Sequence, residues 1–228
     1  MSLREGRFVI AATGLRAEAR IAERSAHVRA VAGGGDGARL ARLIERSIAE
    51  GGQALVSFGI AAGLESSLPP GTCLVGGEIV QAGKSYRADA AWTAKLEDRL
   101  ATKRVVIAGT DRPLTSMSAK KSLKTETGAV AADMESHVVA QLAARYGLPF
   151  AVLRVIADSA ERDIPSAALA GMRSDGGIDV LAVLAALLRH PDQLPALLRL
   201  AADTRAARAA LLRCDDLLGP GLGFGDLV

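Results

Sequence analysis

Aromatic residues and clustered cations are both scarce in this chain. Of its 228 residues only 3% are aromatic (one Trp, two Tyr and four Phe), and 28 Lys and Arg stand against 25 Asp and Glu, for a formal net charge of +3. Proteins that bind single-stranded nucleic acid combine a cationic groove with aromatic side chains on which bases stack. We therefore expect no nucleic-acid partner.

Cysteine and histidine are also few. Cys73 and Cys214 lie far apart in the sequence without a CxxC pair, and His27, His137 and His190 stand alone. This pattern has neither the ligand spacing of a zinc site nor the framework of a disulfide-rich secreted protein. We expect free thiols in a reducing compartment, no bound metal and no resident cofactor.

Long apolar runs are missing, although 50% of the residues are hydrophobic. No segment approaches the roughly 18 uncharged apolar residues that a membrane-spanning helix needs. Near the N-terminus, Arg4, Glu5 and Arg7 precede a run of only five apolar residues, which is too short for the core of a secretory signal. The sequence therefore predicts a cytoplasmic protein, and its apolar content excludes intrinsic disorder.

Alternating hydrophobic periods indicate an α/β protein. Short apolar runs predict strands, and apolar residues at i, i+3 and i+4 spacing predict helices between them. Such alternation favours a largely parallel sheet covered on both faces. We therefore expect residues 1–228 to form a single three-layer domain, with a central, mostly parallel (mixed) sheet, flanking helices and a helical C-terminal tail over residues 178–218. The predicted strands are residues 8–12, 27–32, 54–58, 72–80, 104–108, 129–132 and 150–157; the predicted helices are 15–24, 38–50, 90–100 and 134–146, the last capped by Asp133, with the tail broken at His190-Pro191 and near Pro195.

A glycine cluster after the second predicted strand is similar to a dinucleotide-binding fingerprint. Gly33-x-Gly35-x-x-Ala38 follows that strand and opens a helix. A dinucleotide site also needs an acid at the end of the next strand, to bind a ribose hydroxyl. That strand instead runs into Ser57-Phe58-Gly59. We interpret the cluster as a tight turn and expect no nicotinamide cofactor.

Two acids follow strands at the edge of the sheet where ligands of open α/β sheets bind. Glu135 lies just after a predicted strand, in the first turn of a helix whose dipole favours the ionised carboxylate. We expect it to accept hydrogen bonds from sugar hydroxyls. Asp158 ends the most hydrophobic strand, and apolar surroundings would raise its pKa and let it keep a proton to donate.

The segments around these acids resemble the nucleoside phosphorylase and nucleosidase superfamily. The types that come closest are the hopanoid-associated phosphorylase and, next to it, methylthioadenosine/S-adenosylhomocysteine nucleosidase. The likeness covers nearly the whole chain. It is carried by ADMES at 132–136, YGLPF at 146–150, RVIAD at 154–158, SFGIAAGL at 57–64, Glu18 after the first strand, and the tail from HPDQLP at 190–195 to Leu218-Gly219-Pro220.

The resemblance implies a reaction and roles for particular residues. Cleavage of an N-ribosidic bond builds oxocarbenium character on the sugar and negative charge on the departing base. By similarity, Asp158 protonates N7 of a purine and Glu135 holds the ribose hydroxyls. Met134 packs beneath the sugar, and Glu18 orients or activates an attacking water.

Other positions depart from the family pattern. Pro113 and Leu114 occupy the loop over the base, where relatives often place an aromatic ring, so we expect apolar contact there. Ile60, beside Ala61, stands where relatives have a small hydroxyl residue near the nucleophile. Phosphate as a co-substrate would need cations or backbone N–H groups. The candidates are Arg16, Arg20 and Ser57, the last of which stands where trimeric phosphorylases carry an arginine; whether water or phosphate attacks stays open.

The leading functional prediction is an enzyme that releases adenine from a 5′-substituted adenosine, with adenosylhopane as the substrate that the resemblance implies. The alternatives are a methylthioadenosine/S-adenosylhomocysteine nucleosidase and a catalytically silent nucleoside-binding protein. The resemblance also implies a homo-oligomer. The basic, Leu- and Ala-rich tail suggests peripheral contact with the inner face of the membrane, where a lipid-tailed nucleoside would reside.

Overall fold

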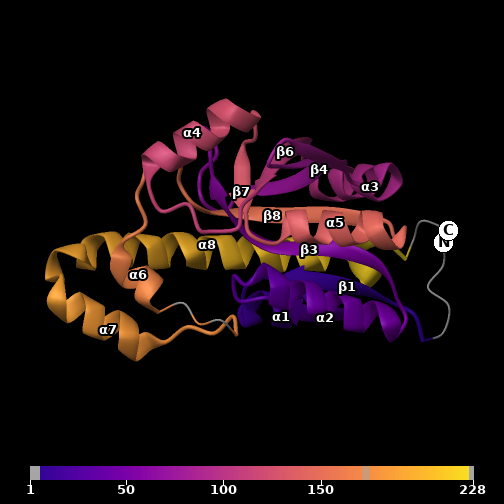
Figure 1. The fold of residues 1–228 in the computed structure, drawn as a ribbon, viewed down its shortest axis with the longest axis horizontal. Helices are drawn as coiled ribbons and strands as arrows, with labels where there is room; N and C mark the ends of the chain where they lie inside the picture. Colours follow the sequence, from indigo (N-terminus) through magenta and orange to yellow (C-terminus); the bar gives the residue numbers. More distant parts are fainter. Residues whose placement is uncertain (1–5, 172, 174, 226–228) are drawn as a thin grey trace.

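A mixed, eight-stranded sheet forms the centre of the computed structural model, which describes residues 6–171, 173 and 175–225 (Figure 1). The strand order is β2-β1-β3-β7-β6-β4-β5, and β8 pairs with both β3 and β4. The pairs β1–β2, β1–β3, β3–β8, β4–β6 and β6–β7 are parallel, whereas β3–β7, β4–β5 and β4–β8 are antiparallel. The strands are β1 (Phe8–Thr13), β2 (Val28–Ala32), β3 (Gly52–Gly63), β4 (Cys73–Gln81), β5 (Lys84–Arg87), β6 (Arg104–Gly109), β7 (Ala131–Asp133) and β8 (Phe150–Asp158).

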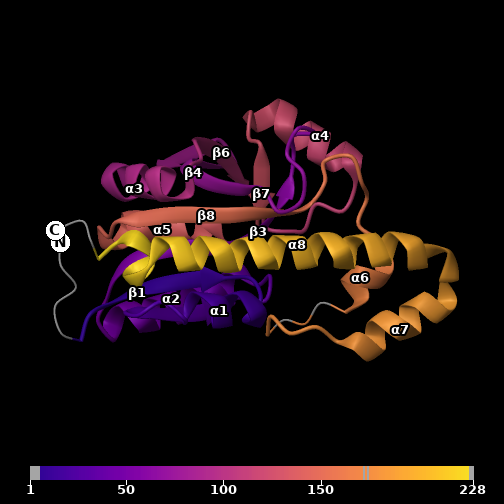
Figure 2. The same ribbon diagram turned by 180° about the vertical axis from the view of Figure 1, so that it is seen from behind.

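Helices cover both faces of this sheet. On one face, apolar residues of α1, α3 and α8 pack against Val9, Phe58 and Leu153. On the other face, α2 and α5 pack against Ile10, Leu55 and the neighbouring strands. Figure 2 shows α8 running along the first of these faces. The predicted three-layer α/β architecture with a mixed sheet is therefore confirmed. The helices are α1 (Arg16–Ala22), α2 (Gly37–Ala49), α3 (Ala90–Leu100), α4 (Met117–Thr127), α5 (Ser136–Tyr146), α6 (Ser166–Ala170), α7 (Val180–Arg189) and α8 (Leu194–Leu218), with short 3₁₀ turns at Pro191–Gln193 and Pro220–Gly223.

Strand β3 is longer than the predicted 54–58, because it pairs with three strands, β1, β8 and β7, along its length. Its first residues pair with β1, residues 55–62 pair with β8, and its last residues, Ala62 and Gly63, pair with β7. Strands β3, β7, β6, β4 and β8 thereby close into a ring of pairings. This closure brings the end of β7 beside the ends of β3 and β8.

Several expectations about the helices were wrong. Helix α5 begins at Ser136, and Asp133 is the last residue of β7, although its Oδ1 still accepts hydrogen bonds from the backbone N–H groups of Glu135 (2.8 Å) and Ser136 (2.6 Å). Glu135 is therefore the N-cap residue and not part of the first turn. Pro195 lies in the first turn of α8, where no intrahelical N–H is required, and does not break the helix. Strand β5 and helices α4 and α6 were not predicted.

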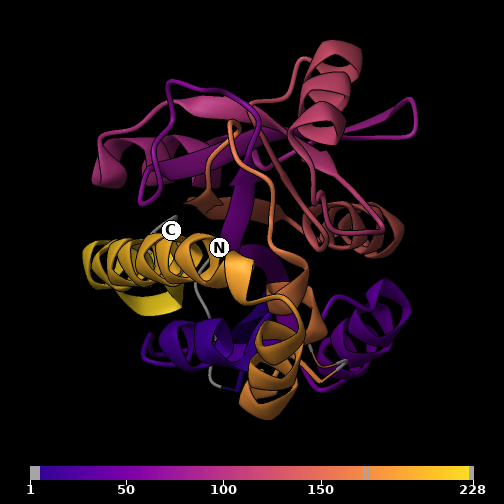
Figure 3. The same ribbon diagram turned by 90° about the vertical axis from the view of Figure 1, so that its left-hand side faces the viewer.

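Helices α6 and α7 and the first half of α8 extend beyond the ends of the strands. Figure 1 shows them at one end of the molecule, and Figure 3 views this end face-on. Within the described part of the chain, no helix is both long enough and apolar enough to cross a membrane.

Candidate active site

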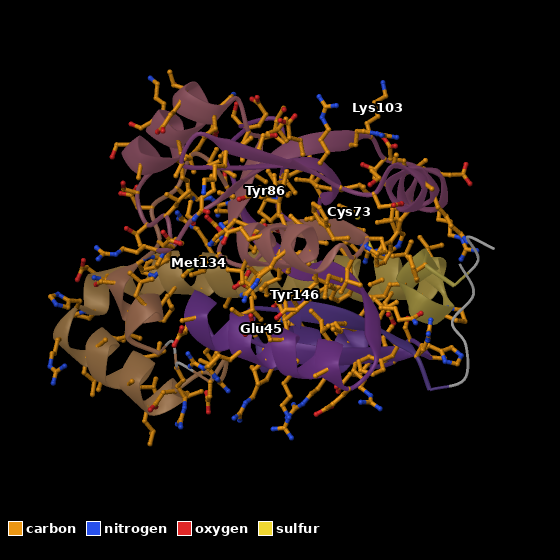
Figure 4. The ribbon with its side chains drawn as sticks, turned by 45° about the vertical axis from the view of Figure 1, so that its right-hand side comes forward. Glu45, Cys73, Tyr86, Lys103, Met134 and Tyr146 are labelled. Atoms are coloured by element: carbon orange, nitrogen blue, oxygen red, sulfur yellow. The ribbon has the colours of Figure 1, made fainter. Side chains whose placement is uncertain are left out.

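A pocket of about 290 Å³ lies where the ends of β3, β7 and β8 meet the turn after β1 and the helices α6 to α8. Its size is close to that of pockets that hold small organic ligands. Figure 4 shows Met134 where the sheet meets these helices. Eight of the residues predicted from the sequence line this one pocket: Glu18, Ile60, Ala61, Pro113, Leu114, Met134, Glu135 and Asp158.

Arg154, a fully buried residue of β8, holds two acids of the pocket in place by ion pairs. Its Nε lies 3.0 Å from Oδ2 of Asp133, and its Nη2 lies 3.2 Å from Oε2 of Glu135. The guanidinium also donates hydrogen bonds to the hydroxyl of Ser57 and to the backbone carbonyl of Ile60. A planar guanidinium with five fixed donors suits such a cluster. Sequence reasoning placed Arg154 in a family motif but assigned it no role.

Glu135 enters the pocket with one oxygen held by Arg154. Its other oxygen, Oε1, faces Gly14, where an added Cβ would approach to 2.8 Å. Glycine at position 14 therefore leaves room for the carboxylate. Burial raises the pKa of Glu135 to about 7, with Arg154 opposing the rise and Asp133 and Glu18 adding to it. The group thus titrates close to neutral pH.

Glu18 is buried and receives three backbone hydrogen bonds. Its Oε2 accepts from the N–H groups of Gly14 (3.0 Å) and Leu15 (2.7 Å), and its Oε1 accepts from the N–H of Ile60 (2.9 Å). Burial raises its pKa, against the opposing charge of Arg154 and these hydrogen bonds. A carboxylate offers about four acceptor sites, so one is left for a ligand or water. Glu18 both caps α1 and joins it to β3.

Asp158 ends β8, as the sequence predicted, but its surroundings are not simply apolar. Its Oδ2 lies 2.5 Å from Nζ of Lys120, a buried lysine of α4. Burial raises the pKa of Asp158, and Lys120 opposes the rise. Lys120 is a residue that sequence reasoning missed, because it sits in a polar segment with several lysines for which no helix was predicted.

The three candidates for binding phosphate do not line the pocket. Arg16 pairs with Asp175 at the surface (2.9 Å), and Arg20 is exposed. Ser57 is buried, and its hydroxyl is bonded to Ser136 and Arg154. Among the described residues that line the pocket, Arg173 is the one Lys or Arg. In that same part of the chain, no three His, Cys, Asp or Glu residues cluster so as to hold a metal ion.

Solved structures of nucleosidases and a related hydrolase share this fold. A 5′-methylthioadenosine/S-adenosylhomocysteine nucleosidase from Helicobacter pylori, solved with butyl-thio-DADMe-Immucillin-A, superposes with a TM-score of 0.64 at 17% identity, covering 91% of this chain and 97% of that one. Futalosine hydrolase of the same organism gives a TM-score of 0.60 at 20% identity, with coverage of 68% and 86%. An S-adenosylhomocysteine nucleosidase from Streptococcus pyogenes gives 0.60 at 17% identity, with coverage of 70% and 87%.

The family comparison reaches the same fold from the sequence. No curated protein sequence matches the chain. The model of the phosphorylase superfamily matches residues 23–189, a segment that contains Lys120, Glu135, Arg154 and Asp158. Because this match spans well over half of its residues, the chain belongs to the phosphorylase superfamily.

Proposed function

We propose that this protein cleaves the N-ribosidic bond of a 5′-substituted adenosine and releases adenine. The observation that carries the proposal is the meeting of Glu18, Glu135 and Asp158 in one pocket, each with a raised pKa. Carboxyl groups with perturbed pKa values in a pocket are typical of catalytic sites. Membership of the phosphorylase superfamily and the nucleosidase names of the structural neighbours favour this reaction class.

Asp158 acts as the general acid in this proposal. The breaking bond leaves its electron pair on the base, and the proton of Asp158 passes to N7 of the purine, so that a neutral base departs. Burial raises the pKa of Asp158, so its protonated form persists to a higher pH than in water. Pro113 and Leu114, which line the same pocket, supply apolar contact for the base.

Glu135 binds the ribose hydroxyls through the oxygen that faces Gly14. Hydrogen bonds to an ionised carboxylate are roughly twice as strong as neutral ones. Positive charge that develops on the sugar ring would also be stabilised by this acid. Met134, whose thioether side chain adapts to irregular shapes, packs against the sugar.

Water is the nucleophile that we propose, and not phosphate. Glu18 has one acceptor site left for a water molecule, as its three backbone donors occupy the others. When the water oxygen bonds to the anomeric carbon of the sugar, Glu18 takes the proton that the water loses. A phosphate dianion would need cations close to the sugar, whereas Arg16 and Arg20 lie outside the pocket and Arg154 is engaged by Asp133 and Glu135. Arg173, which lines the pocket, pairs with Asp175. The products are then adenine and a free sugar with an intact 5′ substituent.

The 5′ substituent is proposed to be apolar and large. The side of the pocket built by the β8–α6 loop and α6 to α8 is lined by Ile164, Leu169, Ile178 and Leu200. Ile178 is also 64% exposed and leads to α7 at the surface. A lipid-tailed adenosine such as adenosylhopane, which the sequence resemblance implies, fits this lining.

The test follows adenine release from methylthioadenosine and from a lipid-tailed adenosine, each with and without phosphate. We expect release of free sugar at a rate independent of phosphate, with higher kcat/KM for the lipid-tailed substrate. Formation of a sugar 1-phosphate would overturn the choice of water. Faster turnover of methylthioadenosine would favour a housekeeping nucleosidase, and nucleoside binding without base release would leave a binding protein.

Asp158→Asn completes this test, because the amide keeps the shape of the carboxyl group but has no proton to give. General acid catalysis contributes about 10²- to 10⁴-fold, and we expect kcat to fall within that range. Asp216→Asn is the matched control, since Asp216 pairs with Arg24 at the surface. A variant that keeps more than about a third of the wild-type kcat would exclude Asp158 as the acid.

A further inference from the structure

Lys120 is a fully buried lysine whose three N–H donors all have partners. Its Nζ donates to Oδ2 of Asp158 (2.5 Å), to the carbonyl of Ser159 (2.7 Å) and to the carbonyl of Arg162 (2.9 Å). Figure 2 shows the loop from β8 to α6 passing beside α4, the helix that carries Lys120. Because a buried ammonium is stable only when it is paired and fully hydrogen-bonded, this lysine has a single defined geometry.

The loop does not depend on Lys120 alone for its attachment to α4. The N–H of Met117 donates to Oδ1 of Asp163 (2.7 Å), and the N–H of Ile164 donates to the carbonyl of Thr115 (2.8 Å). Two neutral carbonyls would also be satisfied by a neutral donor. The feature that calls for a positive charge at position 120 is the carboxyl group of Asp158.

We propose that Lys120 is a positioning residue that holds Asp158 by Oδ2 and so directs the acidic proton to Oδ1, the oxygen left free for the leaving base. Among the described residues, none donates a hydrogen bond to Oδ1, and Asp158 lines the pocket with 13% of its side chain exposed. The inference deepens the proposed function and rests on its assignment of Asp158. When the proton on Oδ1 passes to the base, the electron pair of the O–H bond stays on Asp158, and the ammonium opposite stabilises the carboxylate that forms.

The other charges around Asp158 largely cancel. Arg162, on the β8–α6 loop, and Asp203, on α8, pair with each other at 2.8 Å. Burial raises the pKa of Asp158, Lys120 lowers it, and Asp203 and Arg162 act with smaller and opposite effects. Removal of Lys120 should therefore raise the pKa of Asp158 further. The acid would stay protonated to higher pH but would be weaker and less well placed.

The experiment compares Lys120→Met with the wild-type enzyme in two ways. The first is a titration of the Asp158 carboxyl carbon by ¹³C NMR, which needs no substrate and should move to higher pH in the variant. The second is the pH profile of adenine release, whose alkaline limb should move in the same direction while kcat falls about tenfold to a hundredfold, as expected for a misplaced acid. If Lys120→Met cannot be purified, Lys120→Gln removes the same charge.

A double-mutant cycle separates action through Asp158 from a general loss of structure. In the Asp158→Asn background, Lys120→Met should lower kcat by no more than about twofold. Lys124→Met is the matched control on the same helix, because Lys124 pairs with Glu65 at the surface. This variant should change neither the titration of Asp158 nor the alkaline limb of the pH profile. An Asp158 titration that does not shift in a folded Lys120→Met enzyme would overturn the inference. So would a loss of kcat on Lys120→Met that is as large in the Asp158→Asn variant as in the wild type.

Failure of the proposed function would look different. A wild-type protein that releases no base from any nucleoside, but whose Asp158 titration still responds to Lys120→Met, would contradict the proposed reaction and support the coupling of the two residues. An Asp158→Asn variant with full activity would overturn both the acid and the role of Lys120 in proton delivery.

Discussion

Arg154 lies between two acids in the interior, and its charge is needed to keep both of them there. Arg154→Met would leave Asp133 and Glu135 without their partner. Breaking a buried ion pair in this way costs about 3–5 kcal/mol. We expect a loss of this size in the free energy of unfolding, measured by urea denaturation at neutral pH. The control is Arg46→Met, in an exposed pair with Glu50, which should change stability by less than about 1 kcal/mol; equal losses in both variants would contradict the cluster's role.

The ionisation of Glu135 should make the activity fall at acidic pH. Its pKa is raised by burial to about 7, so the carboxylate is ionised above this pH and protonated below it. If the ionised form binds the ribose, kcat/KM should fall as pH drops through about 7, approaching tenfold per unit. Glu135→Gln should be less active, and its kcat/KM should not show this fall as the pH drops. A 2′-deoxy substrate is the check: if removing the hydroxyl costs the wild type and the variant equally, Glu135 does not contact it.

Helix α8 is joined to the sheet by a pair of thiols. Sγ of Cys214 on α8 lies 3.0 Å from Sγ of Cys73 on β4, across 141 residues of sequence. Hydrogen bonding to Cys214 and burial raise the pKa of Cys73, and the same bond lowers the pKa of Cys214. The sequence predicted free thiols, and they are free in the structure; their contact depends on the packing of α8.

Treatment with diamide should therefore convert these two thiols into a disulfide, with two electrons and two protons passing to the reagent. A cross-link that closes so long a loop stabilises a protein by about 2–4 kcal/mol. Urea denaturation before and after oxidation measures the gain, which dithiothreitol should reverse. Cys73→Ser should show no gain; an oxidised wild type with unchanged stability would mean that the bridge does not form or is strained.

The whole molecule presents an unusual surface beside its pocket. Helix α7 has no charged residue before Arg189, yet Leu181, Leu184 and Leu188 are 78%, 50% and 86% exposed on one stripe. The exposed Leu194 and Leu198 of α8 follow, with exposed Arg199 and Arg205 nearby. A helix with an apolar face and basic neighbours is typical of proteins that lie on anionic membranes. We propose that this surface contacts the membrane from which a lipid-tailed substrate would enter.

Sedimentation with anionic vesicles tests this contact. Binding should weaken as salt rises, since each basic residue near such a surface contributes about 1 kcal/mol and salt screens it. Leu181→Glu combined with Leu188→Glu should abolish binding without lowering kcat on methylthioadenosine. Light scattering of the wild type and the double variant measures their oligomeric state. If the wild type never binds vesicles and the double variant loses a homo-oligomer that the wild type forms, this surface binds a second copy of the chain and not a membrane.

For the whole molecule, the order of the main helices and strands and the identity of the acids in the pocket could be predicted from the sequence, because both depend on local patterns of residues. Apolar runs and amphipathic periods identified the long strands and helices. Glu135 and Asp158 lie at strand ends, which meet at one edge of a sheet, whereas Glu18 was identified through the family resemblance. Helices α4 and α6 were missed because α4 is polar and α6 is short, so neither carries a clear hydrophobic period.

The sequence alone determined that two acids, Glu135 and Asp158, lie at strand ends and that apolar residues suffice for a sheet covered on both faces; Glu18 and the loop at 113–114 came from the family resemblance. Only the tertiary structure decided how these groups are charged and held. Arg154 reaches Asp133 and Glu135, and Lys120 reaches Asp158 across 38 residues. The tertiary structure also places Arg16 and Arg20 outside the pocket. The physical reason is that pKa values depend on burial and on charges brought close by folding, which no spacing along the chain records.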